Sequence, residues 1–244
     1  MERAILPNGD SHPNFIGAWM LEPVSICDEL IAHFDANAHR HRAGTVSAGL
    51  DLEAKNTLDL TTKPKDLNMP ENEVLARYFD KLYICYRDYV AQWPFLNAIA
   101  EEVHIGDFNI QRYERGQHFQ KIHTERSDIS NIHRLFAWMT YLNDVKEEDG
   151  GATVFHHYDL MIQPTKGLTL IWPAEWTHAH KGSVLKTNAK YIVTGWMHFP
   201  FFRVKSINSG AAPRLLNNCD TPESTKPISA VGTLALYSSP SLLL

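Results

Sequence analysis

Two histidines and one glutamate have a spacing that suits a metal site. His123 and Glu125 are separated by one residue, and His180 follows 180 − 123 = 57 residues after His123. Residues i and i+2 of an extended segment face the same side, so the first imidazole and the carboxylate can converge on one ion. His180 must then come from a distant strand that passes nearby. Two imidazoles and one carboxylate leave half of an octahedral metal shell open.

A lysine 190 − 180 = 10 residues after the second histidine adds to this pattern. Lys190 begins Lys-Tyr-Ile-Val-Thr-Gly-Trp, in which Lys190, Thr194 and Trp196 share one face of an expected strand. An inward-facing lysine needs an anionic partner, because burying an unpaired ammonium is costly. The two-histidine, one-carboxylate set is typical of non-haem Fe(II) oxygenases. The spacing therefore predicts a metal together with an acidic co-substrate.

Each part of the pattern has a simpler interpretation. With 13 histidines and 28 acidic residues in the chain, about 1–2 His-x-acid pairs arise by chance, and a solvated polar loop would explain one. Lys190 could face solvent from an edge strand, where lysines discourage aggregation; Trp196 would then also face outward. Asp128 is an alternative carboxylate, and His178 shares a face with His180 if the segment is extended. Periodicity alone leaves these alternatives open.

Bulk properties limit the classes of protein and partner. A chain of 244 residues with 44% hydrophobic residues can form one domain with a packed core. Its net charge of −5 gives no general attraction to nucleic acid or to anionic membranes, so neither is an expected partner. Cys27, Cys85 and Cys219 lack CxxC spacing, which argues against a disulfide framework or structural zinc. Without a signal-peptide pattern or a membrane span, we expect a cytoplasmic protein.

The chain divides into a helical first part and a second part of short strands. Helices are expected at 25–39, capped by Ser25, and at 71–92, with a short strand before them. We expect two substrate loops. One is residues 40–70, a long loop with one strand, and the other is residues 115–133, which show neither a helical nor a strand pattern. Short strands separated by Gly and Pro turns are expected at 104–114, 135–143, 152–156, 167–172 and 190–199. This order predicts a mainly β, α+β fold with helices supporting a β core.

Several motifs, taken in order, resemble one known family. They are Gln111–Gly116, His123–Glu125, Met139–Val145, Gly150–Phe155, Lys166-Gly167 and the block from His180 to Trp196. Over roughly residues 105–200 this order is similar to the prolyl 4-hydroxylase-like branch of the 2-oxoglutarate- and Fe(II)-dependent oxygenases. The resemblance implies a double-stranded β-helix, or jelly-roll, core at 103–200 supported by 1–102. Residues 1–204 would form a single oxygenase domain, followed by an irregular C-terminal tail at 205–244.

The resemblance also implies a role for each candidate residue. His123, Glu125 and His180 would bind Fe(II), and Lys190 would bind the distal carboxylate of 2-oxoglutarate. The remaining co-substrate contacts would come from Thr194, Tyr113, Tyr141 and the pocket-lining Trp196. Dioxygen would be the second co-substrate and ascorbate a supporting reductant. His178 would then lie behind the metal ligands or on the substrate side.

One residue departs from the family pattern. Most relatives carry Asp where this chain has Glu125, although Glu also binds iron in some; a carboxylate of either length disfavours a halogenase. The resemblance implies hydroxylation of a peptidyl (prolyl-like) or small-molecule substrate with release of succinate and CO2. The alternatives are a non-catalytic jelly-roll binding module and a cupin-like metalloenzyme that does not use 2-oxoglutarate. Lys190 argues against both, because neither needs an inward-facing cation.

Overall fold

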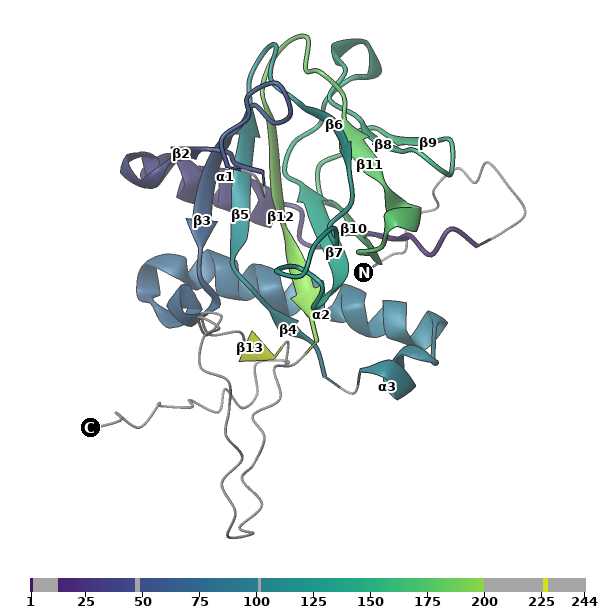
Figure 1. The fold of residues 1–244 in the computed structure, drawn as a ribbon. Helices are drawn as coiled ribbons and strands as arrows, with labels where there is room; N and C mark the ends of the chain where they lie inside the picture. Colours follow the sequence, from purple (N-terminus) through teal and green to yellow (C-terminus); the bar gives the residue numbers. More distant parts are fainter. Residues whose placement is uncertain (2–12, 47–48, 101, 200–225, 228–244) are drawn as a thin grey trace, which may run out of the picture.

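Two antiparallel sheets face each other, and helices cover the outer side of the larger one (Figure 1). The computed structural model describes residues 1, 13–46, 49–100, 102–199 and 226–227. The two long helices are α1 (Ile26–Ala36) and α2 (Glu73–Gln92), and a short α3 (Leu96–Ile99) follows. This arrangement confirms the predicted mainly β, α+β class with a jelly-roll core.

The larger sheet has the order β1-β10-β7-β12-β5-β3-β2, with β4 beside the end of β12 and β13 beside β4. Its strands are β1 (Gly17–Met20), β2 (Arg42–Ala43), β3 (Leu58–Thr62), β4 (His104–Ile105), β5 (Phe108–Tyr113), β7 (Arg134–Tyr141), β10 (Leu168–Pro173), β12 (Lys190–His198) and β13 (Lys226–Pro227). The central position of β12, between β7 and β5, decides where its side chains go. Strands inside a sheet have a neighbour on each side, so Lys190 is not on an edge.

The smaller sheet has the order β6-β11-β8-β9. Its strands are β6 (Phe119–His123), β8 (Thr153–Phe155), β9 (Leu160–Ile162) and β11 (His180–Gly182). β6 and β11 are antiparallel neighbours, and His180 lies directly opposite His123 in the register. Residues that are 57 positions apart in the sequence are therefore cross-strand partners, whose side chains lie close together.

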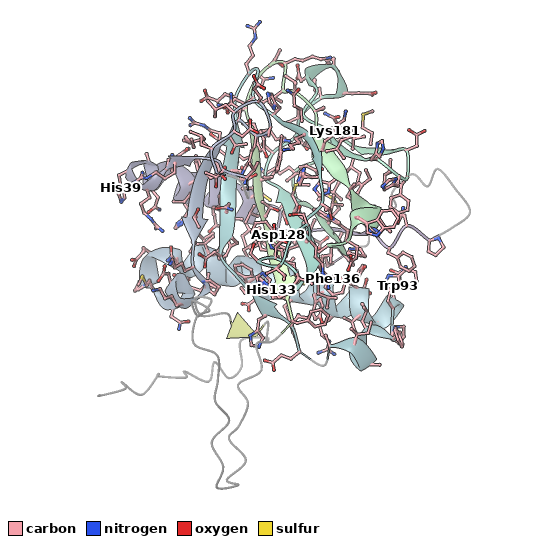
Figure 2. The ribbon with its side chains drawn as sticks, in the orientation of Figure 1. His39, Trp93, Asp128, His133, Phe136 and Lys181 are labelled. Carbon is pink, nitrogen blue, oxygen red and sulfur yellow. The ribbon has the colours of Figure 1, made fainter. Side chains whose placement is uncertain are left out.

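Two apolar clusters hold these layers together, and side chains fill the space between the sheets (Figure 2). The outer cluster joins α1 and α2 to the larger sheet and includes Val193 and Met197 of β12. The inner cluster lies between the sheets and includes Ile192 of the same strand. Helix α2 contributes a buried stripe of Leu75, Tyr78, Phe79, Leu82, Cys85, Tyr86 and Tyr89. Burial stabilises the fold by about 1.5–3 kcal/mol for a large apolar side chain. Both faces of β12 are covered, so the outward-facing interpretation of Lys190 is wrong.

Several predicted boundaries need correction. Ser25 precedes α1 but makes no side-chain capping hydrogen bond, and the helix ends at Ala36 before a separate 3-10 turn at Ala38–Arg40. The expected strand 104–114 divides into β4 and β5 around Gly106, where a Cβ would come within 2.6 Å of the His198 ring. Residues 115–133 do contain a strand, β6, which the sequence interpretation missed.

Other expectations concern the termini and the membrane. Most of the expected irregular tail at 205–244 lies outside the described residues, but its Lys226–Pro227 pair forms β13, so the tail is not irregular there. No helix in the described part of the chain is long and apolar enough to cross a membrane. Cys27 and Cys85 are buried free thiols. The single domain at 1–204 stays a prediction.

Candidate active site

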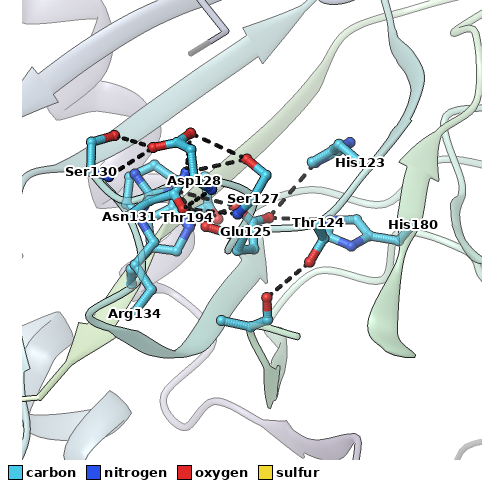
Figure 3. Close-up of polar contacts among 12 residues, drawn as sticks. His123, Thr124, Glu125, Ser127, Asp128, Ser130, Asn131, Arg134, His180 and Thr194 are labelled. Carbon is cyan, nitrogen blue, oxygen red and sulfur yellow. Dashed lines mark hydrogen bonds and ion pairs between the residues drawn. The ribbon is translucent and has the colours of Figure 1, made fainter. Parts of the chain in front are cut away.

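The structure brings His123, Glu125 and His180 together between the two sheets (Figure 3). His123 ends β6, Glu125 follows two residues later, and His180 begins β11. One carboxylate oxygen, Glu125 Oε1, lies 3.4 Å from His180 Nε2 and 3.7 Å from His123 Nε2. One possible ligand atom from each residue lies within 4.8 Å of the other two, and within the described residues this is the one such His/Cys/Asp/Glu group. The set is a possible iron site.

Hydrogen bonds fix which nitrogen each imidazole presents. His123 Nδ1 lies 2.9 Å from the Lys121 carbonyl oxygen, and His180 Nδ1 lies 2.9 Å from the His178 carbonyl oxygen. A carbonyl can only accept, so each Nδ1 carries the proton and each Nε2 keeps its lone pair. Metal-binding histidines commonly have this arrangement. Both Nε2 atoms therefore lie near the Glu125 carboxylate, each with a lone pair that could bind a metal ion.

Aromatic rings hold the two imidazoles in place. The Phe119 ring stacks on His123 with centroids 3.8 Å apart and an interplanar angle of 9°. On the other strand, His180 packs between Phe155 at 5.4 Å and Trp172 at 5.2 Å. Because these contacts restrict ring rotation and exclude water, the ligands are preorganised before any ion binds.

The charges in the group also fit a divalent cation. Burial lowers the pKa of His123 to about 4, with a further contribution from His180, so this imidazole is neutral at physiological pH. Burial opposes ionisation of Glu125, but the adjacent His180 and His123 rings and the indole N–H of Trp196 hold its pKa well below the usual range. A neutral imidazole and an ionised carboxylate are the forms in which these groups bind metals.

The two alternative ligands have other roles. Asp128 lies in an exposed turn, where it accepts hydrogen bonds from the Ser130 backbone N–H (2.8 Å) and the Asn131 side chain (2.9 Å). His178 is buried, and its Nε2 donates to the carbonyl of Asn14 (2.8 Å) while its Nδ1 lies 3.0 Å from the Thr177 hydroxyl. Both nitrogens of His178 are therefore engaged. The group of possible metal ligands therefore contains Glu125 and His180, and it contains neither Asp128 nor His178.

Lys190 is a buried cation without a counterion in the described part of the chain. Its side chain donates to the Gly151 carbonyl at 2.9 Å and lies 4.3 Å from the centre of the Tyr113 ring, its cross-strand neighbour. No carboxylate of the described residues forms an ion pair with it. Burial lowers the pKa of Lys190 from 10.5 to about 8. An anionic ligand could pair with the buried ammonium of Lys190, and the distal carboxylate of 2-oxoglutarate is a ligand of this kind.

The other expected co-substrate residues have protein partners already. Tyr113 donates its hydroxyl proton to Gln111 (2.9 Å), Tyr141 donates to Thr153 (2.7 Å) and Thr194 donates to the Trp138 carbonyl (2.8 Å). Trp196 donates its indole N–H to Glu125 Oε2 at 2.7 Å. Among these predicted co-substrate residues, Tyr113 contacts Lys190, and Trp196 contacts Glu125 of the His-Glu-His group.

Sequence patterns did not reveal two features of the site. Arg134 stacks over the Trp196 ring at 3.7 Å and donates to the Glu125 backbone carbonyl at 2.9 Å. Behind Tyr113 lies a buried polar chain in which Asp59 accepts from Lys55 (2.7 Å), Thr57 (2.5 Å) and Gln111 (3.1 Å). The Arg134–Trp196 and Gln111–Asp59 contacts join different strands, so no spacing along the chain signals them.

Comparisons with known proteins agree with this fold. Residues 108–198 match the family model described as the 2OG-Fe(II) oxygenase superfamily. Among curated proteins, none matches this chain. The matched range contains all eight residues that the sequence interpretation assigned to the site.

Several solved structures that are similar to this chain are prolyl hydroxylases. A viral collagen prolyl hydroxylase from Paramecium Bursaria Chlorella virus-1 is 20% identical over 77% of this chain and 97% of its own, with a TM-score of 0.55. A Pseudomonas putida prolyl-4-hydroxylase is 15% identical over 77% and 94%, with a TM-score of 0.58. A Trichoplax adhaerens prolyl hydroxylase, solved with a hypoxia inducible factor peptide fragment, is 11% identical over 76% and 84%, with a TM-score of 0.60. At these identities the likeness shows a shared fold.

The facing sheets form a jelly-roll fold, and the His-Glu-His group between them offers the ligand set of a non-haem metal site. The β core at residues 108–198 matches the 2OG-Fe(II) oxygenase superfamily, and the chain resembles the prolyl hydroxylase branch of that family, as predicted. The family implies Fe(II) and 2-oxoglutarate as cofactor and co-substrate, and it indicates an oxidoreductase.

Proposed function

We propose that this protein is an Fe(II)- and 2-oxoglutarate-dependent dioxygenase that hydroxylates a peptidyl (prolyl-like) or small-molecule substrate and releases succinate and CO2. The observation that carries the proposal is the combination of a His-Glu-His group with a nearby strand that begins in an unpaired buried lysine. A metal site alone would suit many enzymes. A buried cation that lacks a carboxylate partner among the described residues calls for an anionic ligand as well.

In this proposal each residue has a defined task. His123, Glu125 and His180 hold the iron, and Lys190 binds the distal carboxylate of 2-oxoglutarate with support from Thr194, Tyr113 and Tyr141. When bound, the iron and 2-oxoglutarate supply the oxidising power to insert one atom of dioxygen into a C–H bond of the substrate, while the other atom enters succinate. The chain's own contribution is to position the reactants and keep the site dry.

The positioning comes from side chains already in place. In the neutral imidazoles, the Nδ1 hydrogen bonds of both histidines place the ring lone pair on Nε2, the atom that would bind the metal. The Phe119, Phe155 and Trp172 rings shield the imidazoles from bulk water. Because the ammonium of Lys190 is already desolvated, an arriving carboxylate forms its ion pair without a further dehydration cost for the lysine.

The prolyl-like substrate class is supported by the similar solved structures, which include a collagen prolyl hydroxylase and a prolyl hydroxylase solved with a peptide. Residues 1–204 would form the single domain that does this chemistry. The substrate is best found by screening peptides and small molecules for substrate-dependent release of succinate under air.

Anaerobic titration tests the cofactor assignment before any substrate is known. The protein is loaded with Fe(II), 2-oxoglutarate is added, and visible absorption is recorded. A charge-transfer band that needs both additions supports the proposal, and His180→Gln should not give it. Metal binding without any response to 2-oxoglutarate would favour a cupin-like metalloenzyme. Binding of neither would favour a non-catalytic jelly-roll module.

A further inference from the structure

The two carboxylate oxygens of Glu125 have different partners. Oε1 lies 3.4 Å from His180 Nε2 and 3.7 Å from His123 Nε2, on the side of the two ligand nitrogens. Oε2 accepts the indole N–H of Trp196 at 2.7 Å and lies 3.9 Å from Arg134 Nη1. The carboxylate is thus divided: one oxygen is available to an ion and the other is occupied by the protein.

The donor is itself held firmly. Trp196 lies on the central strand β12, opposite Ala137 of β7. The guanidinium of Arg134 covers the Trp196 ring at 3.7 Å, and the same side chain donates to the backbone carbonyl of Glu125 at 2.9 Å. Ring, carboxylate and backbone are therefore joined in one closed set of contacts, so Oε2 cannot turn toward the histidines without breaking the indole hydrogen bond.

This restraint matters because the ligand is a glutamate. Its side chain is one methylene longer than that of aspartate and has more rotamers, and carboxylates bind ions through either one or both oxygens. A glutamate bound through both oxygens would occupy a fourth position of an octahedral ion. Two positions would remain, whereas a chelating 2-oxoglutarate and dioxygen together need three.

We propose that Trp196 is a positioning residue whose indole N–H limits Glu125 to one-oxygen ligation and so keeps open the position that dioxygen needs beside a chelating 2-oxoglutarate. The inference rests on the proposed metal and 2-oxoglutarate site. It assigns Trp196 a role beyond lining the co-substrate pocket, because the hydrogen bond controls how the carboxylate ligand binds.

Counting metal-bound water tests this without measuring activity. Mn(II) serves as the probe, and broadening of its electron paramagnetic resonance lines in oxygen-17 water reports the number of bound waters. Since an octahedral ion has six positions, one-oxygen ligation leaves about three waters and two-oxygen ligation about two. We expect about three for the wild type and about two for Trp196→Phe, which keeps a ring for Arg134 but removes the donor.

When 2-oxoglutarate is added to saturation, Mn(II) in the wild type should keep about one water and Mn(II) in the variant about none, because chelation takes two positions in either protein. Trp172→Phe is the matched control. Trp172 packs against His180, but within the described residues its indole N–H has no acceptor. That variant should keep the wild-type water count.

The outcomes separate the two proposals. Two waters on the wild-type ion, or three on the ion in Trp196→Phe, would overturn the role of Trp196. Failure of the wild type to bind Mn(II) at all would instead overturn the proposed metal site. If Trp196→Phe does not fold, the wild-type count still decides whether Glu125 binds through one oxygen.

Discussion

Replacing Lys190 with methionine should weaken 2-oxoglutarate binding and stabilise the free protein at the same time. The side chain is buried at 3% exposure, and burial lowers its pKa from 10.5 to about 8. Each pKa unit corresponds to about 1.4 kcal/mol, so keeping the lysine charged costs the fold about 3 kcal/mol at pH 7. Loss of the hydrogen bond to the Gly151 carbonyl opposes this by about 1–3 kcal/mol. The expected net gain is up to about 2 kcal/mol.

The dependence on pH identifies the cause. Lys190 titrates near pH 8 in the folded protein and near 10.5 in the unfolded chain, so the unfolded chain binds more protons between these values. The stability of the wild type relative to the variant therefore rises with pH across this window. Below pH 8 the full cost is present. Denaturant unfolding of both proteins at pH 7 and pH 10, without 2-oxoglutarate, should show a difference in unfolding free energy that shifts toward the wild type at the higher pH.

Binding should change in the opposite direction. An ammonium–carboxylate hydrogen bond contributes about 1.5–3 kcal/mol, so the dissociation constant of 2-oxoglutarate should rise by about 10- to 150-fold in anaerobic calorimetry with metal-loaded protein. Metal affinity should be unchanged, because Lys190 touches no member of the His-Glu-His group.

Lys55 provides a matched control. It is also buried, at 5% exposure, but its ammonium is paired with Asp59 at 2.7 Å. Lys55→Met leaves that carboxylate buried without its partner, which should destabilise the fold by about 3–5 kcal/mol. A Lys190→Met variant that is destabilised like Lys55→Met, and that still binds 2-oxoglutarate normally, would refute the reasoning.

Three further predictions concern other titratable groups. His180→Gln should abolish tight Fe(II) binding in equilibrium dialysis, whereas His178→Gln should retain it; equal losses would show that the ligand assignment is wrong. Asp128→Asn should leave Fe(II) affinity unchanged, because this carboxylate only organises an exposed turn. Burial lowers the pKa of His198 from 6.5 to about 3. Between these two pH values the imidazole is protonated in the unfolded chain but neutral in the folded protein. Stability should thus fall as pH falls from 6.5 to about 3, and His198→Leu should show a smaller drop in melting temperature between pH 7 and pH 4.5; an equal drop would contradict this assignment.

Much of the fold could be predicted where a segment has a regular pattern. The apolar stripe of α2 and the branched and aromatic run of β12 gave elements within two residues of their observed ends. β6 was missed because its five residues are exposed or half-buried and show no alternation, and β11 is only three residues long. Such short strands form because neighbouring strands of the sheet supply hydrogen bonds, and local periodicity cannot reveal those neighbours.

The candidate site was predicted to a similar extent. The residue types and spacing of His123, Glu125, His180 and Lys190 indicated both a metal and an acidic co-substrate, since chemistry of this kind needs those groups in any fold. The proposal of His180 rather than His178 as the ligand, however, is supported by contacts that only the structure shows. His178 gives both nitrogens to neighbours, whereas His180 keeps Nε2 free and lies opposite His123.

The sequence by itself determined the set of reactive groups, the helical and strand-forming segments and the resemblance to a family. Only the tertiary structure decided that Lys190 faces inward without a counterion among the described residues, and that Trp196 and Arg134 restrain Glu125. The physical reason is that charge, burial and hydrogen-bond partners depend on strands far apart in the chain. Residue type sets what a group can do, and its neighbours across the sheets set whether it is charged, free and correctly directed.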